Sequence, residues 1–252
     1  MAYMPKIDSH KGENGKILIV GGSPRYHGSA LFAIEGAKRF ADIVYFMPAK
    51  PCPYLIQAVK NIPEVIVIAS LDDVEKLGVD AILYGPGSDG AGLLKEIVKM
   101  GKKTVIDGDG LKEIREVSKE LLANSIITPH EGEFKMLSGK VGSEENVKEL
   151  ANELGCVVVK KGKQDIISNG KEVLFNDYGN PGLTKGGSGD MLAGLITALF
   201  AKMEAMEASK EGVELLTRTA DKLVFKKGFY YTMEEVANKL AENAVEMWWN
   251  ER

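Results

Sequence analysis

The chain has 252 residues, with 32 Lys and Arg against 36 Asp and Glu, so its formal net charge is −4. This balance excludes the basic footprint of a nucleic-acid-binding protein. A hydrophobic share of 44% with 27% charged residues excludes disordered and fibrous classes. No apolar run approaches the roughly 18 residues that span a bilayer, and charges are spread through the first twenty positions, so we expect a cytoplasmic protein. Cys52 and Cys156 lie far apart and outside any metal-ligand spacing, which predicts two buried thiols.

Short apolar runs of strand length alternate with stretches of helical spacing along the chain. The predicted strands are residues 17–20, 43–46, 65–69, 81–84, 104–106, 125–127 and 157–160. The predicted helices are residues 29–40, 71–77, 93–100, 111–122, 143–154, 190–203, 210–226 and 233–249. Two further short runs, 165–168 and 172–175, flank Asn169-Gly170, which is a strong hairpin signal.

This order of elements predicts an α/β fold of three layers, in which a mostly parallel sheet carries helices on both faces and a short β-hairpin lies near residues 165–175. No linker, repeat or low-complexity tract interrupts the chain. We therefore expect one domain over residues 1–252.

Glycine is abundant, at 28 residues, and it clusters directly after predicted strands. Ligands of open α/β sheets bind beyond the carboxyl ends of the strands, and glycine lets backbone approach a ligand closely. The segment Gly85-Pro-Gly-Ser-Asp-Gly90 formally matches the G-x-G-x-x-G dinucleotide pattern. It follows the fourth strand rather than the first, and Pro86 fixes φ. We favour a loop close to a substrate, with a simple strand-ending turn as the alternative.

The segment Gly186-Gly-Ser-Gly-Asp190 precedes an apolar helix. Glycines at a helix start present several backbone N–H groups and the positive end of the helix dipole, which together bind anions. The segment fits neither a Walker A motif nor a nucleophile elbow. Asp190 could instead only cap the helix. A second tight turn beside it, at Asn180-Pro-Gly182, favours a ligand.

Two further strand ends carry polar side chains. Thr128-Pro-His-Glu-Gly-Glu133 contains one of only three His residues, beside two carboxylates. The carboxylates could equally complement the dipole at a helix start, and the spacing leaves both interpretations open. Lys160-Lys161-Gly162 could be solvated or could suit a nucleotide phosphate or ribose.

Together and in this order, the motifs resemble the family of ATP- or ADP-dependent NAD(P)H-hydrate dehydratases, a branch of the ribokinase-like superfamily, over residues 10–200. The matching segments are His10-Lys-Gly12 with Gly15, Ile19-Val-Gly-Gly-Ser23 with Gly28-Ser-Ala30, Gly85-Pro-Gly87, Asp107-Gly-Asp109, the segment from Thr128 to Glu133, Lys161-Gly162, and Asn180-Pro-Gly182 with the segment from Gly186 to Gly194. The chain departs from the family pattern at Gly108 and Gly110, at Ser188, and at Lys185, whose charge we expect near the nucleotide phosphates.

The resemblance implies dehydration of hydrated NADH or NADPH, (6S)-specific and with ADP favoured over ATP, through phosphorylation of the 6-hydroxyl and elimination of phosphate. It implies Asp190 as catalytic base, and Ala30, Gly87, His130 and Asp190 at the hydrate. It implies Glu133 as a partner of Mg²⁺ through water, and a homo-oligomer without nucleic-acid or membrane partners. The residues implied for the adenine nucleotide are Lys161, Gly162, Lys163, Gln164, Asp165, Gly186, Gly187 and Gly189.

Two alternatives remain at this point. One is a small-molecule kinase of the same superfamily, acting on a hydroxymethylpyrimidine, a thiazole or a sugar alcohol. The other is a regulatory protein that binds a nucleotide without turnover and needs no base.

Overall fold

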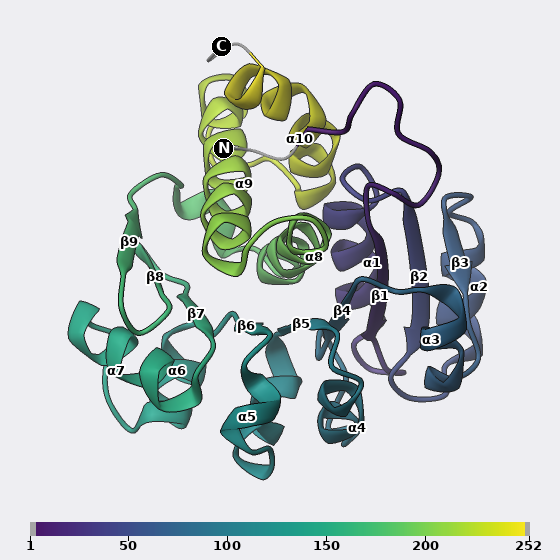
Figure 1. Ribbon diagram of the computed structural model, residues 1–252. Helices are drawn as coiled ribbons and strands as arrows, with labels where there is room; N and C mark the ends of the chain where they lie inside the picture. The colour runs from purple at the N-terminus through teal and green to yellow at the C-terminus, as the bar shows by residue number, and fades with distance from the viewer. Residues whose placement is uncertain (1–3, 250–252) are drawn as a thin grey trace.

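Nine strands form one sheet in the computed structural model, which describes residues 4–249 (Figure 1). The strands are β1 (Lys16–Gly21), β2 (Ile43–Pro48), β3 (Val65–Val67), β4 (Ala81–Tyr84), β5 (Lys103–Ile106), β6 (Ser125–Ile127), β7 (Val157–Lys160), β8 (Asp165–Ser168) and β9 (Val173–Asn176). Their order in the sheet is β3-β2-β1-β4-β5-β6-β7-β8-β9. β1 to β7 are parallel to one another, β8 pairs antiparallel with β7, and β9 pairs antiparallel with β8. The predicted strands and hairpin are confirmed, with small shifts at their ends.

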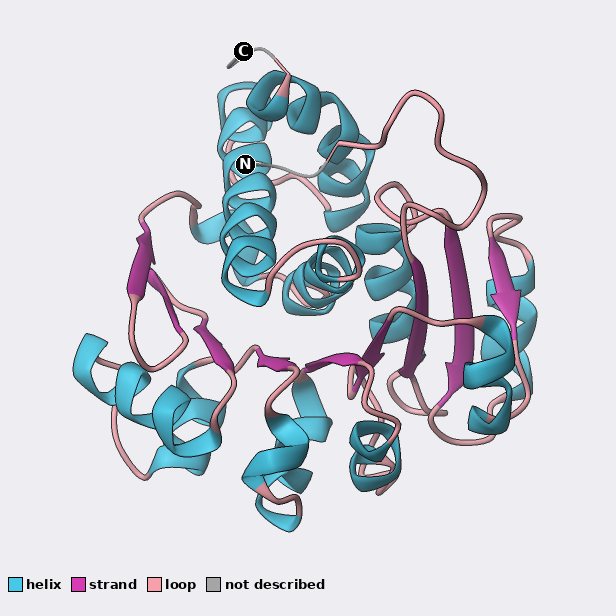
Figure 2. Cartoon of the chain, in the orientation of Figure 1, coloured by secondary structure: helices cyan, strands magenta, loops and turns pink. Residues whose placement is uncertain are grey.

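Helices cover both faces of this sheet (Figure 2). The α-helices are α1 (His27–Ala37), α2 (Pro53–Lys60), α3 (Val74–Leu77), α4 (Leu94–Lys99), α5 (Lys119–Leu122), α6 (Glu131–Ser138), α7 (Glu144–Leu154), α8 (Ser188–Phe200), α9 (Ala205–Lys227) and α10 (Met233–Trp248). Three short 3-10 helices are η1 (Leu71–Asp73), η2 (Gly108–Glu116) and η3 (Pro181–Thr184). The three-layer architecture predicted from the sequence is therefore confirmed.

Side chains that alternate along the strands divide the interior into two cores. Ile17 and Ile19 of β1 face the core formed with α1, α2, α8, α9 and α10. Leu18 and Val20 of the same strand face the core formed with α3 to α7. Figure 1 shows α8 to α10 on one side of the sheet and α4 to α7 on the other. Because both faces are buried, the strands read as nearly continuous apolar runs.

The helix predicted over residues 111–122 is wrong in form. The chain makes the 3-10 helix η2, turns extended at Val117 and Ser118, and only then forms the short α5. Gly108 and Gly110 disfavour a regular helix at its start, and Gly108 adopts a positive φ of 54°. Periodicity alone did not indicate α2, which begins at Pro53 in the position where proline is favoured.

α1 and α8 pack closely against each other through two glycines. A Cβ on Gly194 would lie 2.0 Å from the carbonyl oxygen of Ala33, and one on Gly36 would lie 2.1 Å from that of Met191. Such distances leave no room for any side chain. The crossing therefore holds the start of α8 in a defined position beside α1.

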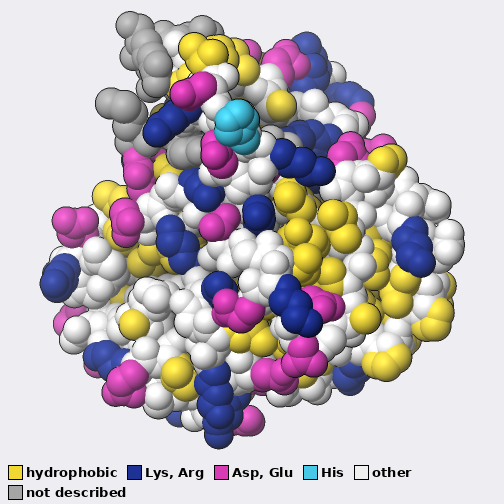
Figure 3. Space-filling view, turned by 45° about the vertical axis from the view of Figure 1, so that its right-hand side comes forward, with side chains coloured by type: hydrophobic (Ala, Val, Ile, Leu, Met, Phe, Trp, Pro, Cys, Tyr) yellow, Lys and Arg dark blue, Asp and Glu magenta, His cyan; other side chains and the backbone are white. Residues whose placement is uncertain are grey.

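The surface shows how the remaining features are distributed. Figure 3 turns the β1 to β3 side of the molecule forward, where hydrophobic side chains lie among Lys, Arg, Asp and Glu. Both cysteines are buried, as predicted. Within residues 4–249 no helix is long and apolar enough to cross a membrane.

Candidate active site

The carboxyl ends of the parallel strands place the predicted motifs at one edge of the sheet. The loop after β1 contacts the loop after β4, since the backbone N–H of Gly22 donates to the carbonyl oxygen of Pro86 at 2.7 Å. β1 and β4 are also the neighbours at which the strand order reverses, the place where open α/β sheets form their ligand crevice. In Figure 2 the arrowheads of β1 and β2 lie at the same end.

Asp190 lies in the first turn of α8 and does not cap it. The N-cap residue is Gly187, which has a φ of +94°, and no side chain makes a capping hydrogen bond there. A Cβ at Gly187 would lie 2.2 Å from the ring of Phe32, so only glycine fits there. The helix thus begins on backbone N–H groups, and the proposal that Asp190 is merely a cap is wrong. Its carboxylate instead interacts with Ser29, Asp107 and Lys161.

The surroundings of Asp190 raise its pKa to about 6. Burial is the largest cause, because a desolvated carboxylate is less stable in its charged form, and the negative charge of Asp107 adds to it. The ammonium of Lys161 and a hydrogen bond from Ser29 act in the opposite direction. A carboxylate whose pKa lies near neutral pH is suited to general base catalysis.

Asp107 and Lys161 form a buried pair beside this carboxylate. Asp107 follows β5, is only 3% exposed, and accepts hydrogen bonds from the Thr128 hydroxyl at 2.7 Å and from Lys161 Nζ at 2.8 Å. Burial alone would lower the pKa of Lys161, but the charges of Asp107 and Glu133 raise it, so the ammonium stays charged. The position of a Cβ on Gly189 lies 3.0 Å from Lys161 Nζ. The cation is therefore held against the start of α8.

His130 and Glu133 together cap α6. His130 Nδ1 accepts hydrogen bonds from the backbone N–H groups of Gly132 at 3.0 Å and Glu133 at 3.2 Å. The Glu133 carboxylate accepts from the backbone N–H of His130 at 2.8 Å, which completes a capping box. Because Nδ1 accepts, the proton of the neutral ring lies on Nε2. The side chain is 62% exposed, so Nε2 can donate to a ligand.

The two small residues predicted at the hydrate lie around the start of α1. A Cβ on Gly87, whose φ is +61°, would lie 2.6 Å from the carbonyl oxygen of Tyr26 and 3.0 Å from Cβ of Ser29. Ser29 also hydrogen-bonds to Asp190, so Gly87 and Asp190 lie on the same side of the sheet. The side chain of Ala30 is completely buried, and it packs beneath Gly22.

The turn between β7 and β8 contains four of the predicted nucleotide residues, and a fifth, Asp165, begins β8. Asp165 is buried and shapes the turn, because it accepts from the N–H of Gly162 at 3.0 Å and from Asn176 Nδ2 at 2.9 Å. Burial raises the pKa of Asp165, and these hydrogen bonds offset part of the increase. Gln164 donates to Asp177 at 2.7 Å. Gly162, Lys163 and Gln164 are exposed at the surface, whereas Asp165 is not.

The expectation that Lys185 brings its charge to the phosphates stays a prediction. Its ammonium donates to the carbonyl oxygen of Phe229 at 2.6 Å and lies 5.2 Å from the centroid of the Tyr231 ring. A carbonyl oxygen and an aromatic face both attract a cation, so the side chain is held at the turn after α9.

Sequence reasoning missed a buried network beneath the loop that carries Gly87. Tyr84 donates to Glu113 at 2.6 Å, and Glu113 also accepts from the N–H groups of Gly92 at 3.1 Å and Leu94 at 3.0 Å. Burial, and after it the hydrogen bond to Glu113, raise the pKa of Tyr84 above its usual range. This network fixes both ends of the loop from Gly85 to Leu93. Neither Tyr84 nor Glu113 belongs to a motif that could have shown it.

The donors for a metal ion are few. No group of three or more His, Cys, Asp or Glu side chains in residues 4–249 is arranged to hold one. Burial raises the pKa of Glu133, and the charge of Lys161 opposes the increase. A single carboxylate, that of Glu133, fits Mg²⁺, which binds through one or two carboxylates together with phosphates and water. It does not fit an ion bound by the protein alone.

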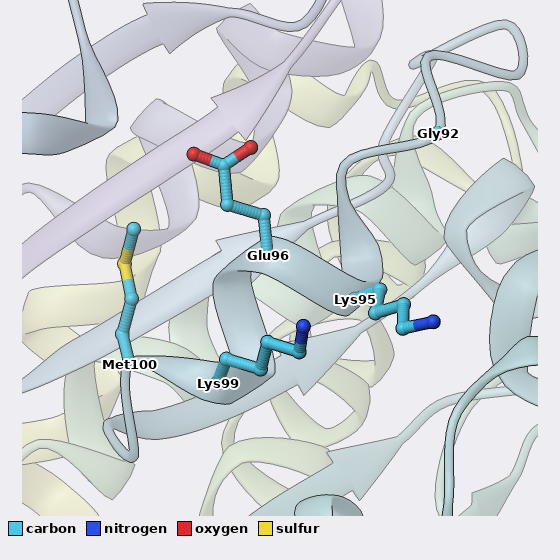
Figure 4. A pocket seen from close by; sticks show the side chains of 5 residues that line it. All are labelled: Gly92, Lys95, Glu96, Lys99 and Met100. Carbon is cyan, nitrogen blue, oxygen red and sulfur yellow. The ribbon is translucent and has the colours of Figure 1, made fainter.

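A separate hollow of about 470 Å³ lies beside α4 and is not part of this site. It is lined by Gly92, Lys95, Glu96, Lys99 and Met100. Figure 4 shows that the Glu96 carboxylate and the Lys95 ammonium point in different directions. No polar groups converge there.

The fold, with its glycine loop opposite a Lys–Asp pair, defines an α/β protein of the ribokinase-like class. The crystal structure of the ADP/ATP-dependent NAD(P)H-hydrate dehydratase from Bacillus subtilis, co-crystallised with ATP and Mg²⁺, superposes with a TM-score of 0.82 at 25% identity, covering 96% of this chain and 93% of that one. The profile of the NAD(P)H-hydrate dehydratase family matches residues 17–242. The chain belongs to this family.

Two curated relatives support the assignment. The chain is 33% identical to the ADP-dependent (S)-NAD(P)H-hydrate dehydratase of Nitrosopumilus maritimus, over 94% of this chain and 90% of the relative. It is 35% identical to the bifunctional NAD(P)H-hydrate repair enzyme Nnr of Methanocaldococcus jannaschii, over 92% of this chain and 48% of the relative. The chain thus spans about half the length of such bifunctional relatives.

Proposed function

We propose that this protein dehydrates the (6S) hydrate of NADH or NADPH, with ADP as the favoured phosphoryl donor. The observation that carries the proposal is Asp190, a carboxylate with a pKa of about 6 at the start of α8, joined through Ser29 to the loop of Gly87. The names of the relatives specify the substrate and the nucleotide. The site supplies a base, an anion-binding helix start and a fixed cation.

In the first step the 6-hydroxyl oxygen of the hydrate attacks the terminal phosphorus of the nucleotide. Asp190 accepts the hydroxyl proton, and the bond from phosphorus to the leaving nucleotide breaks, so that ADP becomes AMP. The backbone N–H groups from Gly186 to Gly189 and the dipole of α8 bind the negative charge of the transferring group. Lys161, held by Asp107, neutralises part of that charge.

In the second step the ring nitrogen donates its electron pair and the carbon–oxygen bond to phosphate breaks. Loss of a proton from the adjacent ring carbon then restores the double bond of NADH, and phosphate is released. His130 donates from Nε2 to the bound hydrate and orients it, while Nδ1 remains bonded to α6. Gly87 allows the ring to approach the backbone, because no side chain fits there.

Mg²⁺ would be held by the nucleotide phosphates and by water bonded to Glu133. When bound, it would neutralise phosphate charge during transfer. The exposed residues of the β7–β8 turn, Gly162 to Gln164, would contact the nucleotide, with Asp165 holding the turn in shape.

The decisive test is to incubate the purified chain with hydrated NADH, Mg²⁺ and either ADP or ATP, and to follow the return of reduced-nicotinamide absorbance. We expect turnover with ADP, and formation of one AMP and one phosphate for each NADH. Asp190→Asn is the matched control, and it should lower kcat about 10²–10⁴-fold, as loss of a positioned base does. Phosphorylation of a hydroxymethylpyrimidine or a thiazole alcohol, with no recovery of NADH, would instead identify a kinase.

A further inference from the structure

We propose that the rim formed by Arg25, Tyr26 and Tyr54 binds the adenosine-phosphate half of the dinucleotide hydrate. This inference rests on the proposed function, because it concerns the part of the same substrate that does not react. It names a second subsite, built from the loops after β1 and β2, that no motif of the sequence indicated.

The rim is continuous with the site of the reacting ring. The main chain and Cβ of Tyr26 lie within 3 Å of the position that a Cβ on Gly87 would occupy. Tyr54, in the first turn of α2, donates its hydroxyl to the carbonyl oxygen of Pro24 at 2.7 Å, which joins the two loops. His27 meets the Tyr54 ring edge-on, with the ring centroids 6.2 Å apart. These contacts give Tyr54 a defined orientation next to the loop of Tyr26.

The rim has the chemistry that an adenosine phosphate requires. Tyr26 and Tyr54 are 40% and 54% exposed, so their rings are accessible to a base. Exposed aromatic rings stack on nucleobases. The Arg25 guanidinium carbon lies 5.1 Å from the centroid of the Tyr26 ring, and within the described residues Arg25 makes no ion pair. An unpaired guanidinium is suited to phosphate.

The loop after β4 is hydrogen-bonded to the loop after β2, beside this rim. Lys50, after β2, donates to the carbonyl oxygen of Asp89, which follows the Gly87 loop and has a φ of +53°. The Asp89 N–H in turn donates to Asp109 at 3.0 Å. The loops after β1, β2 and β4 are therefore held together before any ligand binds, and such preorganisation lowers the entropic cost of binding.

The arrangement of the two ligands gives the direction. In the proposed function the donor nucleotide binds at the β7–β8 turn and the start of α8, and in the strand order β7 lies beyond β4 and β5 from β1. Its terminal phosphate must meet the hydrate in line at Asp190, so the rest of each ligand points away from the other. The distal half of the hydrate consequently runs toward β1 and β2, where Tyr26 and Tyr54 lie.

The test compares two substrates that share the same reacting ring. Hydrated NADH carries the adenosine half, and the hydrate of reduced nicotinamide mononucleotide lacks it. We expect Arg25→Ala and Tyr54→Ala each to raise KM for hydrated NADH about tenfold, within the range of losing one stacking or phosphate contact. The KM for the mononucleotide hydrate, the KM for ADP and kcat should stay unchanged. A larger effect of Arg25→Ala on hydrated NADPH than on hydrated NADH would assign its contact to the 2′-phosphate rather than to the pyrophosphate.

Arg218→Ala is the matched control. Arg218 stacks on Tyr178 at 5.0 Å in the same way, but it lies on α9, away from the rim, and its loss should leave both substrates unaffected. Equal increases in KM for both substrates, or no increase for either, would overturn the inference.

A second measurement separates this inference from the proposed function. If the wild-type protein turns over neither hydrate, the proposed function has failed. Calorimetric binding of ADP-ribose, with the donor site saturated by a non-hydrolysable ATP analogue, then decides the subsite. Binding that is lost in Arg25→Ala and Tyr54→Ala supports the rim, and binding unchanged in both variants, or no binding to the wild-type protein, overturns it.

Discussion

At the scale of single residues, the site is defined by charges that modify one another. Asp107 acts on both Lys161 and Asp190. It accepts a hydrogen bond from the Lys161 ammonium, and its negative charge raises the pKa of Asp190. Each charge is then available in the form that phosphoryl transfer needs: a cation at the helix start and a carboxylate that accepts a proton near neutral pH. These properties come from proximity and burial, and single residues considered alone do not possess them.

The raised pKa of Asp190 predicts how stability depends on pH. Its folded pKa is about 6 against 3.8 for a free carboxyl, so between these values the folded protein binds a proton that the unfolded chain does not. The charged form therefore destabilises the fold, fully above pH 6 and progressively less toward pH 4. Asp190→Asn removes this penalty and should stabilise the protein at pH 8 by up to about 3 kcal/mol.

Thermal unfolding of both proteins across pH 4 to 8 checks this. The advantage of Asp190→Asn should shrink as the pH falls through 6, while in the wild-type protein kcat/KM for the hydrate should fall below pH 6 as the base becomes protonated. An advantage independent of pH would show that the charge of Asp190 is not its cause.

His130 has a structural and a binding role, and two substitutions separate them. His130→Ala removes the cap of α6 and should cost about 0.5–2 kcal/mol of stability. His130→Asn can still accept the N–H groups of Gly132 and Glu133, so it should remain near wild-type stability but lose the Nε2 donor. We expect His130→Asn to raise KM for the hydrate while the affinity for nucleotide, measured by calorimetry, is unchanged. A parallel loss of both affinities would contradict a contact with the hydrate alone.

At the scale of elements, the position of α8 decides where the anion-binding residues lie. α8 packs against α1 without side chains at the closest points, Gly36 and Gly194. The same α1 begins with the residues that contact Gly87 and donate to Asp190. One helix pair thus positions the base relative to the substrate loop.

Gly194→Ala should disrupt this crossing. Its added methyl would lie 2.0 Å from the carbonyl oxygen of Ala33, a backbone atom that cannot turn aside, so we expect destabilisation of about 1–3 kcal/mol or more. Because α8 would move, turnover should fall even at temperatures where the protein stays folded. Gly28→Ala is the matched control: nothing lies within 4 Å of its Cβ position on α1, and it should be neutral or slightly stabilising in thermal unfolding. Equal effects of both substitutions would show that the crossing tolerates a methyl.

At the scale of the whole molecule, one sheet joins all parts of the site. Strands from β1 to β9 pair without interruption, and α8 contacts β1, β4 and β5. The single domain over residues 1–252 stays a prediction, as do the homo-oligomer and the cytoplasmic location. Light scattering of the purified protein tests the oligomeric state.

A continuous sheet predicts cooperative unfolding. Far-UV and near-UV circular dichroism should report one coincident thermal transition, since neither core can open without exposing the same strands. ADP with Mg²⁺ at about 100 times its Kd should raise the stability by about 2.7 kcal/mol. Two separated transitions, of which ADP shifts only one, would indicate two independent units instead.

Much of this protein was determined by local sequence. Apolar runs predicted the strands, because a strand buried on both faces has no other composition, and the glycine and polar clusters that follow the strands predicted the edge at which the site lies. The order of the motifs also indicated the family that the comparisons confirmed.

The tertiary structure alone decided what each of these residues can do. Pattern left open whether Asp190 caps α8, and the answer came from Gly187 and from Ser29, which is 161 positions earlier in the chain. No pattern indicated that Lys185 donates to the carbonyl oxygen of Phe229, and the link between Tyr84 and Glu113 crosses 29 positions. Burial, hydrogen bonding and charge interactions depend on distance in space, and a pKa or a side-chain direction is therefore a property of neighbours that only the folded chain brings together.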